Sequence, residues 1–414
     1  MKRWRLAAPA LALALGLVAG ACGDDSDSAS DTTETTAATG GEGRTLTIAL
    51  GGPFSGASKA TGDNIRNGAT LAASEVNDAG GITDGPLKGA RIVFKEFDDA
   101  GVPANGAGNM RTIIDDDDVV AFVGSGISDV SVAMAPTASR EDFPFLSAYA
   151  SSPKILEAAK DSKSVFVVPP TFPAYAFSVT DELLRAGHTR PAIINGTGTY
   201  GDGIADLVVE RLNEKDITPV AKESFTFADT DFRTQLAKIK DADPDSLVVV
   251  GLANIDALIL TQADELGLDV PVFDPGGITN NDTFLKAAGP LAEGVIGNTP
   301  TLASRDTPAT KSLRDRYTAA TGQSVVPDPA VFSYEGVRAV AAAFAAGATG
   351  RSDLPEFLHR IDIADTGVGA LRFGEDGSRI GGRLYIFKIT GGKPEFFRGY
   401  EQTGPRAVKE VPLA

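Results

Sequence analysis

Small and hydroxylated residues follow each of two apolar runs, Val119–Val123 and Phe143–Ala148. These residues are Gly124, Ser125, Gly126, Ser128 and Asp129 after the first run, and Ala150, Ser151, Ser152 and Pro153 after the second. Two adjacent parallel strands that end in such loops present free backbone N–H groups and hydroxyls at one edge of their sheet. The pattern therefore predicts a crevice for a small anionic or zwitterionic ligand.

Two short motifs also occur in enzymes. The segment Ser151–Lys154 fits the S-x-x-K pattern of serine acyl enzymes, which leaves open a hydrolase that uses Ser151 and Lys154. The chain has no KTG or SDN partner triplet, so we favour a ligand-binding loop and expect no catalytic residue. The segment Gly196–Gly201 fits the G-x-G-x-x-G pattern, but no acid ends a second strand about 20 residues later. We therefore expect no dinucleotide cofactor.

Residue types that bind metals are scarce or poorly spaced. The only histidines are His188 and His359, and the only cysteine is Cys22. Neither histidine has another ligand-type residue at the spacing of a metal site. The acidic run Asp115–Asp118 lies between a predicted helix and a predicted strand, where a solvated corner is a commoner role than cation binding. We expect no metal site.

The beginning of the chain resembles an export and anchoring signal. Basic residues precede the apolar run Leu6–Val18, which is too short to span a bilayer. The small residues before Cys22 resemble a bacterial lipobox, so we expect residues 1–21 to be a signal peptide and Cys22 to be lipidated. An ordinary secretory signal cut near Ala21 is the alternative. Residues 22–43 carry no large apolar side chain and are predicted to form a disordered tether.

The remaining length and the charge limit the possible classes. A chain of 414 residues is too long for one ordinary core and fits two lobes. The formal net charge of −17, without a basic stripe, argues against a nucleic-acid partner. The sequence therefore predicts an exported, two-lobed protein that acts on small solutes.

From residue 44 onward, β runs alternate with amphipathic helices, as in parallel sheets covered on both faces. The predicted strands are 45–50, 91–97, 119–123, 143–148, 165–168, 191–195, 219–225, 246–250, 270–273, 294–298, 371–373, 385–389 and 395–400. The predicted helices are 63–77, 104–116, 172–186, 202–214, 231–240, 255–266, 309–321, 328–346 and 352–360. We expect an α/β fold of two Rossmann-like lobes with parallel sheets. The lobes are residues 44–168 with 300–372, and residues 169–299 with 373–414, joined by a hinge of several crossings that includes Pro169–Pro173.

A series of motifs, in order and at fixed spacings, resembles a known family. The motifs are Gly52–Gly56 (GPFSG), Asn67–Ala69, Val76–Ile82 (VNDAGGI), Asp98–Ala100, Phe122–Gly124, Tyr200–Gly203 (YGDG), Asp229–Phe232, Asp245–Val248, Ala292–Val295, Ser333–Gly336 and Phe373–Gly377. Over Arg44–Tyr400 the chain resembles the Leu/Ile/Val-binding-like solute-binding proteins of branched-chain amino acid ABC transporters. The resemblance implies a type I periplasmic binding protein fold, in which two lobes close on a ligand like a Venus flytrap.

The resemblance also implies roles for individual residues. Ser128 corresponds to a helix-opening serine that holds a ligand carboxylate. Ala150 and Ser151 correspond to a pair whose carbonyl and hydroxyl meet the head group of an amino acid. Tyr200 corresponds to a tyrosine of the second lobe that closes over the ligand, and Ser55 lies in the first loop, which lines the same cleft.

The chain departs from the family pattern at two places. Gly276 stands where the family has a carboxylate for the amino group of the ligand, and Leu252-Ala253 stands where it has a packing tyrosine. The candidates for the lost carboxylate are Asp129, Asp256 and Asp274, although helix caps or surface charges are commoner roles for such residues. An acid at a helix N-terminus, such as Asp129, repels an anionic ligand group unless a cation lies beside it. The ligand is therefore not restricted to leucine, isoleucine or valine.

These observations predict an extracytoplasmic, lipid-anchored protein that captures a small polar solute and delivers it to an ABC permease. A zwitterionic amino acid is the first expectation, followed by amides, urea-like solutes and aromatic acids. The alternative is an accessory lipoprotein that senses a ligand and signals instead of transporting it. An adjacent permease and ATPase in the genome would distinguish the two.

Overall fold

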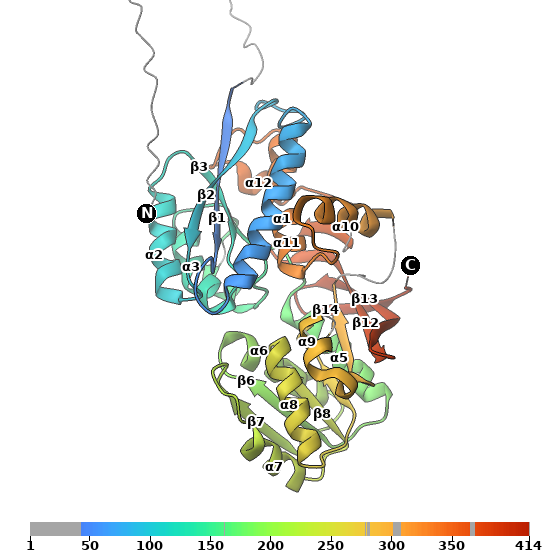
Figure 1. Cartoon of the computed structure of the whole chain (residues 1–414). Coiled ribbons are helices and arrows are strands. Elements are labelled where there is room, and N and C mark those ends of the chain that lie inside the picture. Colours follow the sequence, from blue (N-terminus) through green and yellow to red (C-terminus); the bar gives the residue numbers. More distant parts are fainter. Residues whose placement is uncertain are drawn as a thin grey trace, which may run out of the picture. The chain divides into compact units, whose positions relative to one another are not determined.

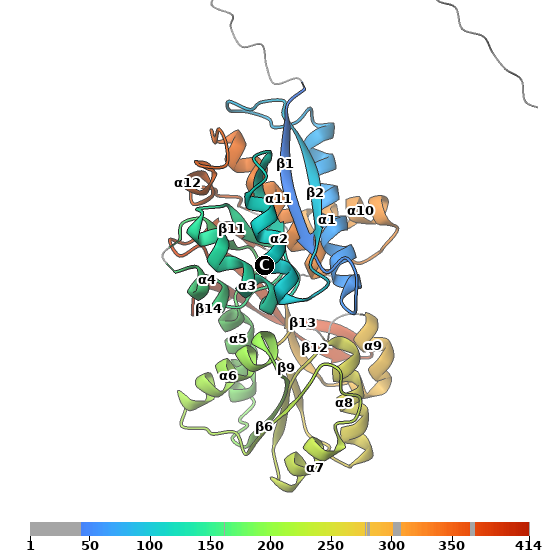
Figure 2. The same ribbon diagram turned by 90° about the vertical axis from the view of Figure 1, so that its left-hand side faces the viewer.

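The computed structural model describes residues 43–160, 162–277, 279, 282–300, 308–364 and 369–413. The predicted signal peptide, Cys22 and nearly all of the predicted tether lie outside these ranges. Within them, no helix is both long enough and apolar enough to span a bilayer. The described chain contains two lobes, each built on its own sheet (Figure 1 and Figure 2).

The sheet of the first lobe has the strand order β2-β1-β3-β4-β5. Its strands are β1 (Thr45–Gly52), β2 (Arg91–Asp98), β3 (Val119–Gly124), β4 (Phe145–Ser147) and β5 (Val165–Val167). All neighbouring strands pair in parallel, so their carboxyl ends lie at one edge of the sheet. The nearly continuous apolar sequences of β1 and β3 fit this position, because the sheet is covered on both faces.

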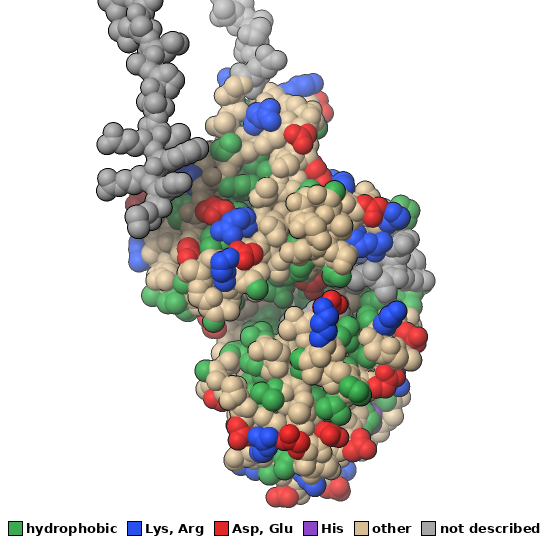
Figure 3. Space-filling view, viewed as in Figure 1, with side chains coloured by type: hydrophobic (Ala, Val, Ile, Leu, Met, Phe, Trp, Pro, Cys, Tyr) green, Lys and Arg blue, Asp and Glu red, His purple; other side chains and the backbone are tan. Residues whose placement is uncertain are grey.

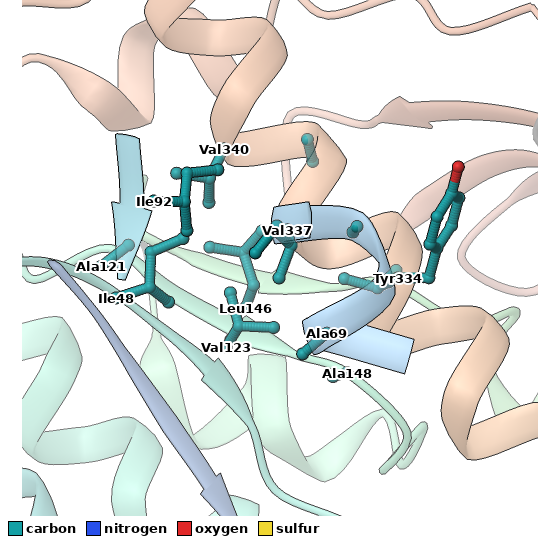
Figure 4. Packing of buried hydrophobic residues seen from close by; sticks show 14 of the residues in the cluster. Ile48, Ala69, Ile92, Ala121, Val123, Leu146, Ala148, Tyr334, Val337 and Val340 are labelled. Carbon is teal, nitrogen blue, oxygen red and sulfur yellow. The ribbon is translucent and has the colours of Figure 1, made fainter. Parts of the chain in front are cut away.

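Helices from distant parts of the chain cover the two faces of this sheet. One core cluster joins the sheet to α1 (Lys59–Asp78), α10 (Pro308–Thr321), α11 (Asp328–Ala345) and α12 (Leu354–Leu358). The other joins it to α2 (Pro103–Ile114), α3 (Ser128–Arg140) and α4 (Lys154–Ala159). In Figure 4, side chains of α1 and α11 pack together against those of the strands. A Cβ at Gly68 would lie 1.9 Å from the Ala330 carbonyl oxygen, so this close helix pair requires glycine.

The sheet of the second lobe has the order β14-β13-β12-β10-β9-β8-β6-β7, with β11 paired to β12. Its parallel strands are β6 (Pro191–Gly196), β7 (Ala221–Phe225), β8 (Ser246–Val250), β9 (Val272–Asp274) and β10 (Ile296–Thr299). Its antiparallel strands are β11 (Gly369–Phe373), β12 (Arg379–Thr390), β13 (Lys393–Gly404) and β14 (Ala407–Val411). The expected parallel pairing thus holds for β6–β10, and β11–β14, whose antiparallel pairing was not expected, make this sheet mixed. The tight turn Gly391-Gly392 has positive φ at both residues, which suits a hairpin and returns the chain antiparallel.

The helices of the second lobe also form two layers. A core cluster on one face contains residues of α5 (Phe172–Arg185) and α6 (Thr199–Asn213). A cluster on the other face contains residues of α7 (Arg233–Asp241), α8 (Ala253–Glu265), α9 (Asp282–Ala288) and the 3-10 helix Gly289–Ala292. The predicted α/β fold with two lobes is confirmed.

The chain crosses between the lobes near the end of β5 and within β12. Ser378, just before β12, bridges Val167 of the first sheet, whereas Tyr385 of β12 pairs with Thr299 of the second. The backbone N–H of Thr171, between β5 and α5, donates to the side chain of Gln402 in β13 at 2.9 Å. The predicted crossing between Thr299 and Pro308 lies largely outside the described residues.

Most predicted elements exist, with shifted ends. The helix predicted from Asp63 begins one turn earlier, at Lys59, because Asp63 pairs with Lys59 and Arg66 instead of capping a helix. The short elements α4, α9 and β14 were not predicted. They have few residues on which a periodic pattern can be recognised.

Candidate functional site

The loops that can hold a ligand lie at the carboxyl ends of the parallel strands in both lobes. We call the loops after β1, β3 and β4 the first edge. We call the loops after β6, β8 and β9 the second edge. Thr199, the first residue of α6, donates to Asp129 Oδ1 in α3 from its backbone N–H at 3.3 Å and from its hydroxyl. This contact joins the two edges, and Figure 3 shows the surface indented where the lobes meet.

Close backbone approaches shape the first edge. Gly124 has φ +154°, and a Cβ there would lie 2.2 Å from a backbone oxygen of β1, so only glycine fits. The loops after β3 and β4 are tied together, because the N–H of Ala150 donates to the Ser125 carbonyl at 3.4 Å. The buried hydroxyl of Ser147 donates to the Ala150 carbonyl at 2.7 Å. The polar groups of this edge are thus largely hydrogen-bonded within the first lobe.

The structure places the predicted residues of the first lobe on these loops. Ser128 begins α3 and Ser151 follows β4, and both are buried, with 7% and 9% of their surface exposed. Ala150 is buried between them in the chain, and its carbonyl already accepts the Ser147 hydrogen bond. Ser55 is exposed in the loop after β1, and its N–H donates to Asp98 at 3.2 Å.

Two adjacent acids support this edge in different ways. Asp98 accepts N–H groups of the loop after β1, and these bonds hold the pKa of its carboxyl below the usual value although burial opposes them. Asp99 is 2% exposed, and burial raises its pKa to about 6. It accepts the Gly101 N–H at 2.8 Å, and the Ser125 hydroxyl lies 3.4 Å from its other oxygen.

Tyr200 and aromatic neighbours occupy the second edge. Tyr200 lies in the first turn of α6, and its ring centroid is 5.9 Å from that of Phe172 and 6.4 Å from that of Phe227. Its hydroxyl donates to the Gly276 carbonyl at 3.4 Å. Burial raises the pKa of this phenol well above its usual value.

Asp129 lies at the first edge, where its carboxylate accepts the Thr199 hydrogen bonds described above. The predicted repulsion of an anion is therefore reduced by donors from the other lobe. The structure places Asp129 in a contact between the lobes.

The two remaining candidate acids differ in their surroundings. Asp274, at the end of β9, accepts the Gly276 N–H at 2.7 Å and the Thr279 N–H at 2.9 Å. Asp256, in the first turn of α8, is fully buried, and neither of its oxygens has a hydrogen-bond partner among the described residues. Burial, followed by the charge of Asp274, raises the pKa of the Asp256 carboxyl well above its usual value.

Sequence reasoning missed two tyrosines beside these groups. Burial raises the pKa of Tyr149 and Tyr175, and in both the next cause is the charge of Asp328. Asp274 of the second lobe also raises the pKa of Tyr149, and Tyr149 raises that of Tyr200. The charge of an acid from the second edge thus acts on Tyr149, a residue of the first lobe. For Tyr149 the sequence did offer a signal, because this residue directly precedes Ala150, a predicted site residue.

The enzyme and metal motifs gain no geometric support. Lys154 is exposed, Ser151 is buried, and no hydrogen bond joins their side chains in the described structure. In the acidic corner, Asp116 pairs with Lys95 at 2.6 Å and Asp117 with Arg351 at 3.4 Å. The described ranges contain no group of three or more potential ligands that could hold a metal ion.

Two surface cavities lie elsewhere. One of about 690 Å³ is beside His359, and one of about 490 Å³ is lined by residues of α1, α10 and α11. No predicted site residue lines either of them. We therefore place the candidate site at the two strand edges.

Comparison with known proteins agrees with this architecture. A family model described as periplasmic binding protein matches residues 45–393. The Leu/Ile/Val-binding protein homolog 3 of Brucella melitensis is 26% identical over 352 residues, covering 84% of this chain and 92% of that protein.

Solved structures show the same fold. The branched-chain amino acid transporter substrate binding protein LivJ from Streptococcus pneumoniae, in complex with isoleucine, has a TM-score of 0.74 at 23% identity and covers 89% of this chain and 99% of its own. A solute binding protein of an ABC transporter from Rhodopseudomonas palustris, in complex with 3,4-dihydroxy benzoic acid, has a TM-score of 0.76 at 23% identity. It covers 87% of this chain and 98% of its own. The predicted type I periplasmic binding protein fold is confirmed.

Proposed function

This chain belongs to the periplasmic binding protein family, and from that premise we propose that it captures a small polar solute between its lobes for an ABC permease. The observation that carries the proposal is the pair of strand edges, joined by the bonds from Thr199 to Asp129. Loops at the carboxyl ends of parallel strands are the usual ligand sites of such sheets. Here two of these edges lie together.

The proposed mechanism is closure linked to binding. Ligand contacts from both lobes exist together only in the closed form, so the ligand shifts the population toward closure. Ser128, Ala150 and Ser151 hold the head group from the first lobe, with Ser55 in the flanking loop. Tyr200 clamps it from the second lobe, and the permease recognises the closed form.

The relatives support an amino acid as the solute. The Brucella melitensis relative is named for leucine, isoleucine and valine, and the Streptococcus pneumoniae structure contains isoleucine. The Rhodopseudomonas palustris structure contains 3,4-dihydroxy benzoic acid, so the fold also accepts an aromatic acid. We propose a zwitterionic amino acid or a related compound, bound without a cofactor and without catalysis.

A periplasmic binding protein works outside the cytoplasm. We further propose that Cys22 carries a lipid after removal of residues 1–21, and that residues 22–43 tether the body to the membrane. Metabolic labelling with a fatty-acid probe tests this step, since Cys22→Ser should abolish the label. Label that persists on this variant would contradict the anchor.

A thermal-shift screen tests the capture of a solute. The panel contains the twenty amino acids, urea, short amides, polyamines, sugars and aromatic acids, added to protein that has been refolded to remove carried ligand. A ligand at a hundred times its Kd adds about 2.7 kcal/mol to the free energy of unfolding. A shift that Ser128→Ala combined with Tyr200→Phe abolishes would support the site. No shift with any compound would contradict solute capture.

A further inference from the structure

The cavity of about 490 Å³ in the first lobe lies outside the two strand edges. It is lined mainly by residues of α1, α10 and α11, and none of the predicted site residues is among them. Pockets that bind small molecules in proteins have volumes of about 300–1,000 Å³. This cavity is therefore large enough for a ligand of its own, separate from the proposed solute site.

One wall of the cavity is apolar and built from small side chains. On α11, three alanines follow Arg338 by three, four and seven positions, so they lie on the same helix face as that arginine. Because alanine side chains are short, they leave space between the helices. The residues of this wall are Ala72 and Val76 of α1, Ala341, Ala342 and Ala345 of α11, and Ile363.

Tyr334 of α11 lies at the polar end of the cavity and is 1% exposed. Figure 4 shows its hydroxyl directed away from the labelled core residues. The hydroxyl donates to Glu75 Oε2 in α1 at 2.7 Å and accepts a hydrogen bond from Arg316 Nη1 in α10 at 2.9 Å. Arg316 also pairs with the other oxygen of Glu75. Glu75, the only acid among the described lining residues, is thus already engaged.

Arg338 brings a second guanidinium group to the same phenol. Its Nη1 lies 3.5 Å from the Tyr334 hydroxyl, and its guanidinium carbon lies 5.5 Å from the ring centroid, against 5.6 Å for Arg316. Within the described part of the chain, no carboxylate pairs with Arg338. Two like charges at one ring repel each other, and the carboxylate of Glu75 offsets only one of them. The polar end therefore carries a surplus positive charge, in a chain whose formal net charge is −17.

An apolar wall beside a surplus guanidinium group matches an anion that has an apolar tail. Guanidinium groups bind carboxylates through two parallel hydrogen bonds, and a surplus of one charge suits a monoanion. We propose that this cavity is a second ligand site, which takes a small monocarboxylate with an apolar tail. Arg338 holds the carboxylate together with Arg316, and the tail is buried along the alanines of α11. The proposal does not depend on solute capture at the strand edges.

Isothermal titration calorimetry on the whole protein tests the site with four probes. The probes are octanoate, acetate, which lacks the tail, octan-1-ol, which lacks the charge, and octylamine, whose charge is reversed. We expect octanoate to bind and each of the other probes to bind at least tenfold more weakly. Equal binding of octanoate and octan-1-ol would overturn the proposal, because the arginines would then contribute nothing. Absence of octanoate binding would overturn it as well, and would favour a contact with another protein at this cavity.

Two variants show whether octanoate occupies this cavity. Arg338→Gln removes the surplus charge and should weaken octanoate binding at least tenfold. Ala342→Leu fills space at the apolar wall with another good helix former and should weaken binding to a similar extent. Arg111→Gln, at an exposed position on α2, removes the same charge and should leave the affinity unchanged. An affinity that is unchanged in both cavity variants would overturn the proposal.

A further comparison separates this site from the strand edges. Octanoate binding that is lost in Ser128→Ala combined with Tyr200→Phe, but kept in Arg338→Gln, would place octanoate at the strand edges. That result would overturn the inference while leaving solute capture intact.

The thermal midpoint of ligand-free Arg338→Gln should stay close to that of the unmodified protein, because no ion pair among the described residues is lost. This measurement separates loss of a ligand contact from loss of folding. Ala342→Leu, which keeps Arg338, decides the question if that midpoint falls.

Discussion

Two fully buried acids of the described residues, Glu335 at the crossing between the lobes and Asp256 at the second strand edge, have opposite surroundings. Where the chain crosses between the lobes, Arg379 forms a two-pronged ion pair with Glu335 at 2.5 and 3.1 Å and also donates to the Val168 carbonyl at 3.0 Å. At the second strand edge, Asp256 is equally buried but has no hydrogen-bond partner among the described residues.

The difference separates a buried acid that is held by bonds inside the protein from one without hydrogen bonds among the described residues. Arg379 joins β12 to α11 and to the segment after β5, so its bonds hold the crossing together. A charge with all its bonds inside the protein has little capacity left for a ligand. A buried acid without hydrogen bonds instead lowers the stability of the folded protein.

The largest effect is expected at the crossing. Arg379→Met removes the ion-pair partner of the buried Glu335 carboxylate, which should lower the free energy of unfolding by about 3–5 kcal/mol. Urea unfolding at neutral pH measures this. The double variant Arg379→Met with Glu335→Leu should recover most of the loss, because both members of the buried ion pair are then replaced by apolar side chains. A single-variant loss below about 1 kcal/mol would show that the crossing does not depend on the pair.

Asp99 is intermediate between Glu335 and Asp256, because its buried carboxyl has few hydrogen bonds. Because burial raises its pKa from 3.8 to about 6, the folded protein binds this proton more tightly than the unfolded chain does. Its contribution to stability should therefore fall as the pH rises from about 4 to about 6 and stay constant above that. The fall corresponds to about 3 kcal/mol, at about 1.4 kcal/mol per pKa unit.

Asp99→Asn isolates this contribution, since an amide keeps the hydrogen bond from Gly101 without the charge. The variant should be more stable than the unmodified protein at pH 7.5 and nearly equal at pH 4. Unfolding curves at both pH values measure the difference. An equal effect at the two pH values would contradict a carboxyl that titrates near pH 6.

Replacing the buried acid by leucine should change the free energy of unfolding in opposite directions at the second edge and at the crossing. Asp256→Leu replaces an unpartnered acid by an apolar side chain of similar shape, so the free protein should gain about 1–2 kcal/mol. Glu335→Leu, the matched change at the crossing, should be destabilising because it removes the carboxylate that pairs with the buried Arg379 guanidinium. If both variants lose stability, the two buried acids are alike and the comparison fails.

The smallest effect is expected at the contact between the edges. Thr199→Val removes the hydroxyl that donates to Asp129, and we expect a loss of about 1 kcal/mol or less in unfolding free energy. Thr197→Val, at a nearby exposed position, is the control and should change little. A loss equal to that of the control would show that the contact does not stabilise the described arrangement.

Much of the fold could be predicted because its signals are local. The apolar runs of β3 and β8, and the small residues after them, follow from a parallel sheet buried on both faces. The first strand edge was likewise visible in the stretch that contains Ser128, Ala150 and Ser151. Short or edge elements such as α4 and β14 carry too few residues for a periodic signal, and the antiparallel β12–β14 extension depends on a hairpin turn.

The sequence by itself determined the alternation of strands and helices, the two lobes and the loops of the first edge, because turn chemistry and hydrophobic period act over a few residues. Only the tertiary structure decided which of the three candidate acids has no hydrogen-bond partner among the described residues. Asp129, Asp256 and Asp274 are alike in sequence, each near the start of a helix or the end of a strand. The partner of Asp129 is 70 residues away in the chain, and the isolation of Asp256 arises from rings and loops of separate elements. Hydrogen bonding and burial of a side chain depend on such distant contacts, which no local pattern contains.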